Sequence, residues 1–160
     1  HGETFADVWR HHGYDLSEHV IRVPLILRAP GIAPSRQATP VSLVDVVPTA
    51  LALTDTPAPP TLDGVDLTPL LLRGTPLAPR VLFSDTWKFS HEGEQHIDLV
   101  GAYDGTRKLV LDRTDQTLWQ HDPSRVDAAP RLLTTWTNDP LLRSLLGYVE
   151  ETGGAVRLRD

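Results

Sequence analysis

The sequence predicts an α/β protein, and three stretches carry this prediction. Val23–Leu27 is a short apolar run, too brief for an independent helix, and is typical of a strand buried on both faces. Two β-prone runs around an Asp-Gly turn, Ile97–Tyr103 and Arg107–Leu111, predict an antiparallel hairpin. A leucine stripe between Leu141 and Val149 predicts a C-terminal helix that lies on one face of the small sheet.

Polar side chains gather just before the first predicted strand. They are His1, Glu3, Asp7, His11, His12, Asp15, Glu18 and His19. Polar groups at one end of a central strand indicate a site, and Gly2 is expected to let the backbone turn sharply between His1 and Glu3. If residues 11–19 are helical, His12 and Asp15 share a face. These histidines lack the His-x-x-x-His pattern with a third ligand that is typical of a zinc site. From spacing alone, the start of a solvated helix is therefore the simpler interpretation.

The segment after this strand is expected to be a proline-rich surface connection, from Pro30 to Pro40. Asp45 is then a candidate N-cap, with Pro48 in the first turn of a core-packing helix. The expected buried stripe of that helix is Val46, Thr49, Ala50 and Leu53. A short apolar segment, Leu67–Leu72, ends at Arg73 and Gly74. Composition changes after these loops, which predicts a main α/β part over residues 1–79 and a small sheet-plus-helix part over residues 80–160.

The second half contains two further expected strands, Val81–Ser84 and Thr117–Gln120. The polar stretch that carries His91, Glu92, Glu94 and His96 is interpreted as a solvated surface loop. Asp139 and Pro140 predict the start of the last helix, and Gly153 and Gly154 predict its end.

Composition limits the possible functions. The 160 residues carry 15 Lys and Arg against 21 Asp and Glu, a net charge of −6, and no basic block longer than a pair, which argues against a nucleic-acid partner. No apolar run approaches the roughly 18 residues of a membrane span, so no membrane partner is expected. The absence of Cys excludes disulfide and thiolate chemistry within these residues. Because the chain has no Met and opens on His1, we expect a processed product or a fragment.

The order of several short motifs resembles the C-terminal half of the sulfatase family, within the alkaline-phosphatase-like superfamily. These motifs are His1-Gly2-Glu3, His12-Gly13, Glu18 with Val20–Ile26, Val44–Thr49, Leu62-Asp63-Gly64 with Leu67 and Pro69–Leu71, Asp104–Leu109, Leu118-Trp119 and Asp122-Pro123. Each motif alone is weak, but the order covers nearly the whole chain. The resemblance implies part of an alkaline-phosphatase-like central sheet with flanking helices, followed by the small antiparallel sheet packed on the C-terminal helix.

The resemblance further implies a fragment of a hydrolase that cleaves sulfuric esters with a divalent cation, usually calcium, and a formylglycine nucleophile. His1 matches the second metal ligand of the family's Asp-His-Gly-Glu segment. The other metal ligands and the nucleophile would lie upstream, in the remainder of the same polypeptide, so these 160 residues alone are expected to be inactive. The implied substrate is a small-molecule or saccharide sulfate ester.

His12 matches the family's Lys or His that contacts the sulfate and can protonate the leaving oxygen. This sequence has a shortened loop between Glu3 and His12 and no Lys there, so His11 is an alternative to His12. A phosphoester or phosphonate hydrolase of the same superfamily is the alternative enzyme. A noncatalytic binding module is the alternative from another class.

Overall fold

The computed structural model describes residues 2–3, 12–89, 96–135, 138–154, 156 and 158. The chain groups into two compact units. Unit 1 combines His1–Pro24 with Val81–Asp160, and unit 2 is Leu25–Arg80. The N-terminal polar segment therefore belongs with the small sheet, although it is separated from that sheet in sequence by all of unit 2. The domain division between residues 79 and 80 stays a prediction.

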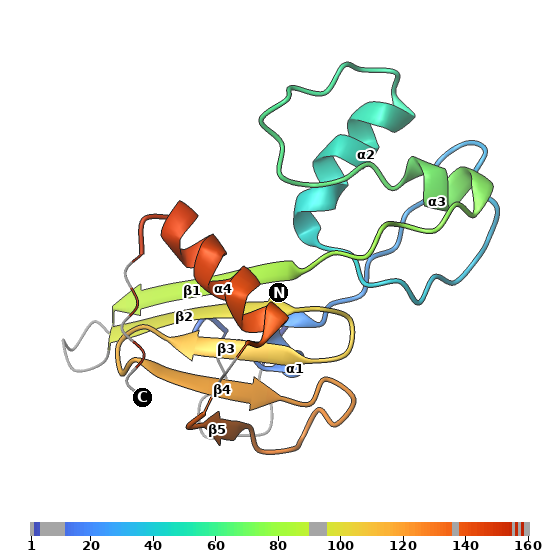
Figure 1. The fold of residues 1–160 in the computed structure, drawn as a ribbon. Coiled ribbons are helices and arrows are strands. Elements are labelled where there is room, and N and C mark those ends of the chain that lie inside the picture. Colours follow the sequence, from blue (N-terminus) through green and yellow to red (C-terminus); the bar gives the residue numbers. More distant parts are fainter. Residues whose placement is uncertain are drawn as a thin grey trace. The chain divides into compact units, whose positions relative to one another are not determined.

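Unit 1 is built on a five-stranded antiparallel sheet whose spatial order follows the sequence, β1-β2-β3-β4-β5 (Figure 1). The strands are β1 (Leu82–Phe89), β2 (His96–Tyr103), β3 (Lys108–Asp112), β4 (Thr117–His121) and β5 (Arg131–Leu133). The predicted hairpin is confirmed as β2 and β3, and Tyr103 pairs with Lys108 next to the turn. The Asp104 carboxylate closes this turn, since its Oδ1 accepts from the backbone N–H of Thr106 at 2.9 Å and of Arg107 at 2.8 Å. Strand β5 was not foreseen.

One face of the sheet is covered by helix α4 (Pro140–Glu151). Leu109 and Leu111 of β3 point to this face and are fully buried, as is Leu145 of the helix. Asp139 caps the helix as predicted, because its carboxylate accepts from the backbone N–H of Leu141 at 2.9 Å. The prediction of an α/β chain with a small antiparallel sheet packed on a C-terminal helix is confirmed.

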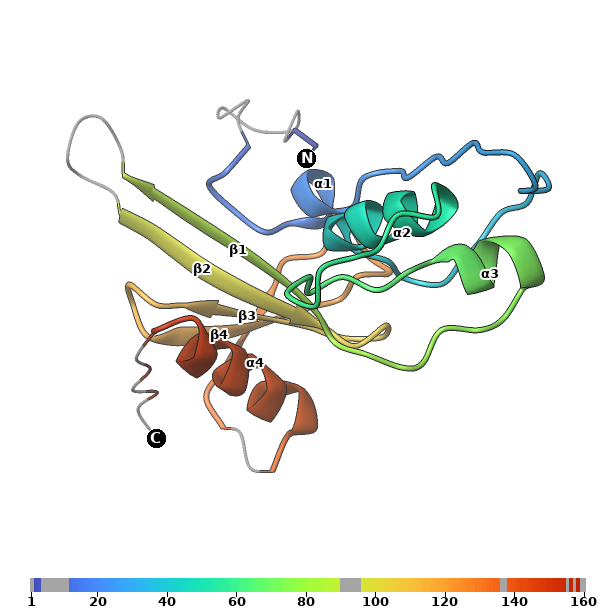
Figure 2. The same cartoon turned by 90° about the horizontal axis from the view of Figure 1, so that it is seen from above.

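The other face of the sheet is covered by the N-terminal segment and its short helix α1 (Glu18–Ile21). Figure 2 shows α1 and α4 on opposite sides of the strands. Leu16 and Val20 are each only 4% exposed. Leu16 fits over Gly101 of β2, where a Cβ atom would come within 3.2 Å of the leucine Cδ1. The sheet is therefore buried on both faces, which antiparallel sheets do not require.

Unit 2 holds a 3-10 turn η1 (Leu43–Asp45) and two helices, α2 (Val46–Leu53) and α3 (Thr68–Arg73). The prediction that the Asp45 side chain caps α2 is wrong. Its buried carboxylate instead accepts from the backbone N–H of Ser42 at 2.8 Å and of Val65 at 2.9 Å, and it forms a two-pronged ion pair with Arg80. Burial opposes ionisation of Asp45, but these donors outweigh it and lower the pKa of the carboxyl. Asp45 thus ties three stretches of unit 2 together.

One local prediction near the start of the chain is wrong, and one condition set on the sequence is not met. Val23–Leu27 forms no strand in the described residues, and Leu25 and Ile26 are 36% and 88% exposed. A strand needs a neighbour for its backbone groups, and the described chain offers this stretch none. Residues 12–17 form bends and extended backbone rather than a helix, so His12 and Asp15 do not share a helix face.

The stripe predicted on the helix after Asp45 is only partly correct. Thr49 is buried, whereas Ala50 is exposed. No helix in the described part of the chain is long and apolar enough to cross a membrane.

Candidate functional site

The structure brings together two of the polar residues singled out in the sequence, Glu3 and His12. The Nδ1 atom of His12 contacts the Oε1 atom of Glu3. The His12 side chain is 47% exposed and that of Glu3 is 33% exposed, so a ligand in solution can reach the pair. A carboxylate at Nδ1 fixes the orientation of an imidazole ring and stabilises its protonated form.

Gly2 explains how Glu3 reaches this position. The Gly2 N–H donates to the carbonyl oxygen of Val20 at 2.7 Å, so Gly2 lies directly against α1. A Cβ atom at Gly2 would lie 2.1 Å from the His19 carbonyl oxygen, which is a clash with backbone. The glycine is therefore required for the close approach of the two backbones.

Two residues of β1 hold the stretch that follows His12. The Thr86 hydroxyl donates to the carbonyl oxygen of Gly13 at 2.9 Å, and Gly13 adopts a left-handed backbone with φ of 85°. The Lys88 Nζ atom lies 3.8 Å from the centre of the Tyr14 ring, a cation–π contact. His12 thus precedes backbone that is fastened to a strand.

Lys108 of β3 fastens the next part of the segment. Its side chain is buried, and its Nζ atom donates to the Leu16 carbonyl oxygen at 2.7 Å and to Glu18 Oε1 at 2.5 Å. A buried ammonium is costly unless it is paired, and here one carboxylate and one carbonyl pair it. The N-terminal segment therefore supplies the acceptors that a charged residue inside the sheet requires.

The pKa of His121 depends on the same charged side chains, Lys108 and Glu18. It lies opposite Lys108 in the pairing of β3 with β4. Burial, followed by the positive charge of Lys108, lowers the pKa of His121 to about 4, although Glu18 and Asp15 oppose the shift. His121 is therefore neutral near pH 7 and is not a proton donor there.

The remaining candidates are dispersed or lie outside the described residues. His1, Asp7, His11, His91, Glu92 and Glu94 are outside them. Asp15 accepts from the backbone N–H of Ser17 at 2.7 Å, a local turn contact, and His19 Nε2 lies 3.2 Å from Asp127 Oδ1 on the surface. His96 lies edge-on to Trp87, with 6.0 Å between ring centres.

The described residues do not by themselves fit a calcium site. Within 2–3, 12–89 and the described parts beyond, no three His, Asp or Glu side chains gather where they could hold one ion. Calcium takes six to eight oxygen ligands, and Glu3 offers one carboxylate that already contacts His12. The cation and the role of His1 as its ligand stay predictions, and no chemical step is derived through the ion.

Sequence reasoning missed the residues that position the segment, above all Thr86, Lys88 and Lys108. Thr86 and Lys88 lie beyond the strand predicted at Val81–Ser84, which the structure extends to Phe89. Lys108 did carry a signal, because it is a charged residue that directly precedes the apolar residues Leu109–Leu111 of a predicted strand. A lysine in such a run needs an acceptor from another part of the chain.

Comparison with known proteins identifies no family. No protein-family model matches the chain, and no curated protein is significantly similar to it. Among solved structures, a match is the structure of BT4656 in complex with its substrate D-glucosamine-2-N,6-O-disulfate. The sequences are 20% identical and the TM-score is 0.49, over 68% of this chain and 23% of that chain. This chain thus spans about a quarter of the length of its structural neighbour, and the likeness is too distant to carry an argument about activity.

Proposed function

We propose that this chain is the C-terminal part of a sulfuric ester hydrolase, in which His12 contacts the sulfate group of the substrate. The order of sequence motifs supports the family. The observation that carries the role of His12 is its contact with Glu3, on backbone that Thr86 and Lys108 hold to the sheet. Orientation of this kind is what a catalytic imidazole needs.

The proposed chemistry of His12 is proton donation. Cleavage of a sulfate ester leaves negative charge on the departing oxygen, and a protonated imidazole within hydrogen-bond reach can neutralise it. Glu3 holds the Nδ1 side of the ring, so Nε2 is the atom that would donate toward the substrate. Glu3 is then a positioning residue that orients the His12 ring.

The proposal assigns the nucleophile and most of the metal shell to residues upstream of this chain, with His1 as one ligand of a divalent cation. The proposal that this chain is part of a larger domain is supported by exposed apolar side chains in unit 2. They are Leu25, Ile26, Leu43, Val44 and Val47. Neighbouring strands supplied by the rest of the polypeptide would cover Leu25 and Ile26. The 160 residues alone are then expected to hydrolyse no aryl sulfate.

The test uses the enzyme that contains this chain, with aryl sulfate as substrate. His12→Ala should lower kcat about 100-fold or more, and His12→Lys should restore part of that loss. Glu3→Gln should have a smaller effect, about tenfold. His19→Ala is the matched control, because His19 lies in the same segment but pairs with Asp127 on the surface.

Three results would contradict the proposal. They are unchanged turnover in His12→Ala, turnover of an aryl sulfate by the 160 residues alone, and hydrolysis of an aryl phosphate with none of the sulfate. The last result would replace the sulfatase with a phosphoester hydrolase of the same superfamily.

A further inference from the structure

A second polar site lies on the sheet face that carries α4, opposite to the face that holds the His12 segment. It is a pocket of about 300 Å³ between β4, β5 and the start of α4. Leu118, Leu133 and Leu142 supply its apolar lining. Gln120 belongs to this face because it pairs with the core residue Leu109, whereas the neighbouring His121 pairs with Lys108.

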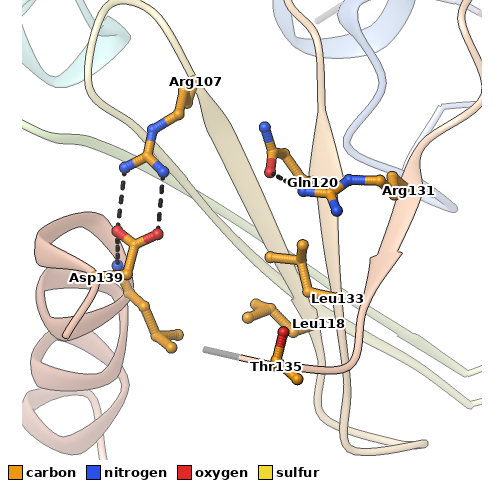
Figure 3. A pocket seen from close by; sticks show the side chains of 8 residues that line it. Arg107, Leu118, Gln120, Arg131, Leu133, Thr135 and Asp139 are labelled. Atoms are coloured by element: carbon orange, nitrogen blue, oxygen red, sulfur yellow. Dashed lines mark hydrogen bonds and ion pairs between the residues drawn. The ribbon is translucent and has the colours of Figure 1, made fainter. Parts of the chain in front are cut away.

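The pocket contains two guanidinium groups with different partners (Figure 3). Both terminal nitrogens of Arg107 donate to the Asp139 carboxylate at 3.0 Å, and Arg107 Nε lies 3.6 Å from Asp104. This fork is the main reason that the pKa of Asp139 is lowered. The positive charge of Arg107 is therefore already balanced by the carboxylates of Asp139 and Asp104.

The positive charge of Arg131 faces a neutral side chain instead. Its Nη2 atom donates to the Gln120 Oε1 atom at 2.9 Å, and Gln120 is neutral. In the part of the chain that the structure describes, no carboxylate lies within ion-pair distance of Arg131. The Arg131–Gln120 pair and the Arg107–Asp139 pair stand on either side of the pocket, with Leu118, Leu133 and Thr135 between them (Figure 3).

We propose that this pocket binds the oxyanion group of a small organic anion. Arg131 pairs with the oxyanion, the Gln120 amide and the Thr135 hydroxyl are further donors, and the partly buried Leu133 contacts the apolar body of the ligand. A planar guanidinium suits both carboxylate and sulfate oxygens. A pocket of this volume lies at the lower end of the range for small-molecule sites, which fits a ligand the size of a single substituted ring.

The test is a titration of the purified protein with benzoate, phenyl sulfate and phenol, followed by NMR of the Arg131, Gln120 and Thr135 signals. At least one of the two anions should bind saturably, with a Kd of about 1–10 mM for so small a ligand. The anion that binds more tightly identifies the group as carboxylate or sulfate. Phenol, which presents the same ring without an anionic group, should bind at least about tenfold more weakly.

Arg131→Gln should weaken anion binding about 10- to 100-fold, the expected loss of a charge-assisted hydrogen bond. Arg125→Gln is the control, because it removes the same charge from an exposed residue between β4 and β5 that does not line the pocket. Thr135→Val is a second variant and should weaken binding less than Arg131→Gln does. Thermal unfolding of each variant separates loss of binding from loss of folding.

The proposal is overturned if neither anion binds saturably or if phenol binds as tightly as the anions. Equal weakening by Arg131→Gln and Arg125→Gln would also overturn it, since a general effect of net charge would then explain the data. None of these measurements depends on hydrolysis of a sulfate ester, so the pocket and the proposed function are tested separately.

Discussion

Unit 1 and unit 2 differ in where their apolar side chains lie. In unit 1 both sheet faces are covered, by α4 and by the N-terminal segment, and Leu109, Leu111 and Leu145 are fully buried. Most of the exposed large hydrophobic residues in the described chain belong to unit 2: Leu25, Ile26, Leu43, Val44, Val47, Val65 and Leu72. Unit 1 therefore buries a core of its own, whereas unit 2 leaves more of its large apolar side chains exposed.

Composition explains part of this difference. Unit 2 contains ten of the 14 prolines in the chain and no aromatic residue. Proline lacks a backbone donor, so this unit depends on side-chain contacts such as those of Asp45 in place of sheet ladders. The lack of tryptophan in unit 2 has a practical use, because tryptophan fluorescence reports unfolding of unit 1 alone.

The largest effect is expected from Leu109→Ala in the core of unit 1. This change should lower the free energy of unfolding by about 2–5 kcal/mol, because the residue is fully buried and leaves a cavity. Denaturant titration followed by far-ultraviolet circular dichroism measures it, because this signal reports the helices of both units. Ile26→Ala in unit 2 is the matched control and should change the free energy by less than about 0.5 kcal/mol, since Ile26 is 88% exposed. If both variants lowered the free energy of unfolding by a similar amount, the claim that unit 1 buries its apolar side chains and unit 2 exposes them would be contradicted.

The next largest effect is expected from Lys108→Met, which tests the attachment of the N-terminal segment to the sheet. Removal of the ammonium leaves the largely buried carboxylate of Glu18 without its partner, at a cost of about 3 kcal/mol in unfolding free energy. The double variant Lys108→Met with Glu18→Gln should recover part of this loss.

Hydrogen exchange at Gly2 adds a second measurement for this variant. The Gly2 N–H bonds to Val20, so its exchange should accelerate when α1 is released. Unchanged exchange at Gly2 would show that the segment is held without Lys108.

In unit 2 the corresponding change is Asp45→Asn. It removes the charge that Arg80 pairs with while keeping one acceptor oxygen, and it should cost about 2 kcal/mol in local stability. Amide exchange of Val65 measures the effect, since this N–H donates to Asp45. Asp55→Asn is the control because Asp55 is exposed and its φ of 51° is one that Asn tolerates. Equal protection of Val65 in both variants would argue against a central role for Asp45.

A last effect is expected from His121, and it appears only when the pH falls below about 6.5. The pKa of His121 is about 4 in the folded protein, below its ordinary value near 6.5, so the unfolded chain binds more protons between these values. The contribution of His121 to stability is therefore complete above about pH 6.5 and decreases as the pH falls toward 4. Denaturation midpoints at several pH values should fall less steeply in His121→Gln than in the unsubstituted protein. Parallel curves would exclude His121 as the cause.

The sequence by itself determined the local elements of unit 1. The Asp104-Gly105 turn, the β-prone runs that form β2 and β3, and the Asp139–Pro140 start of α4 each depend on short-range chemistry, and the structure confirms each prediction. The leucine stripe also identified the face of α4 that packs on the sheet.

Only the tertiary structure decided how distant segments combine. It showed that Gly2 lies against α1, that Lys108 holds Leu16 and Glu18, and that Asp45 binds Arg80 in place of capping a helix. Local patterns carry no information on such partners, because a buried charge or a close backbone approach is satisfied by whichever segment the fold brings near. For the same reason the apolar run Val23–Leu27 predicted a strand that the described chain does not form, since a strand exists only where another strand pairs with it.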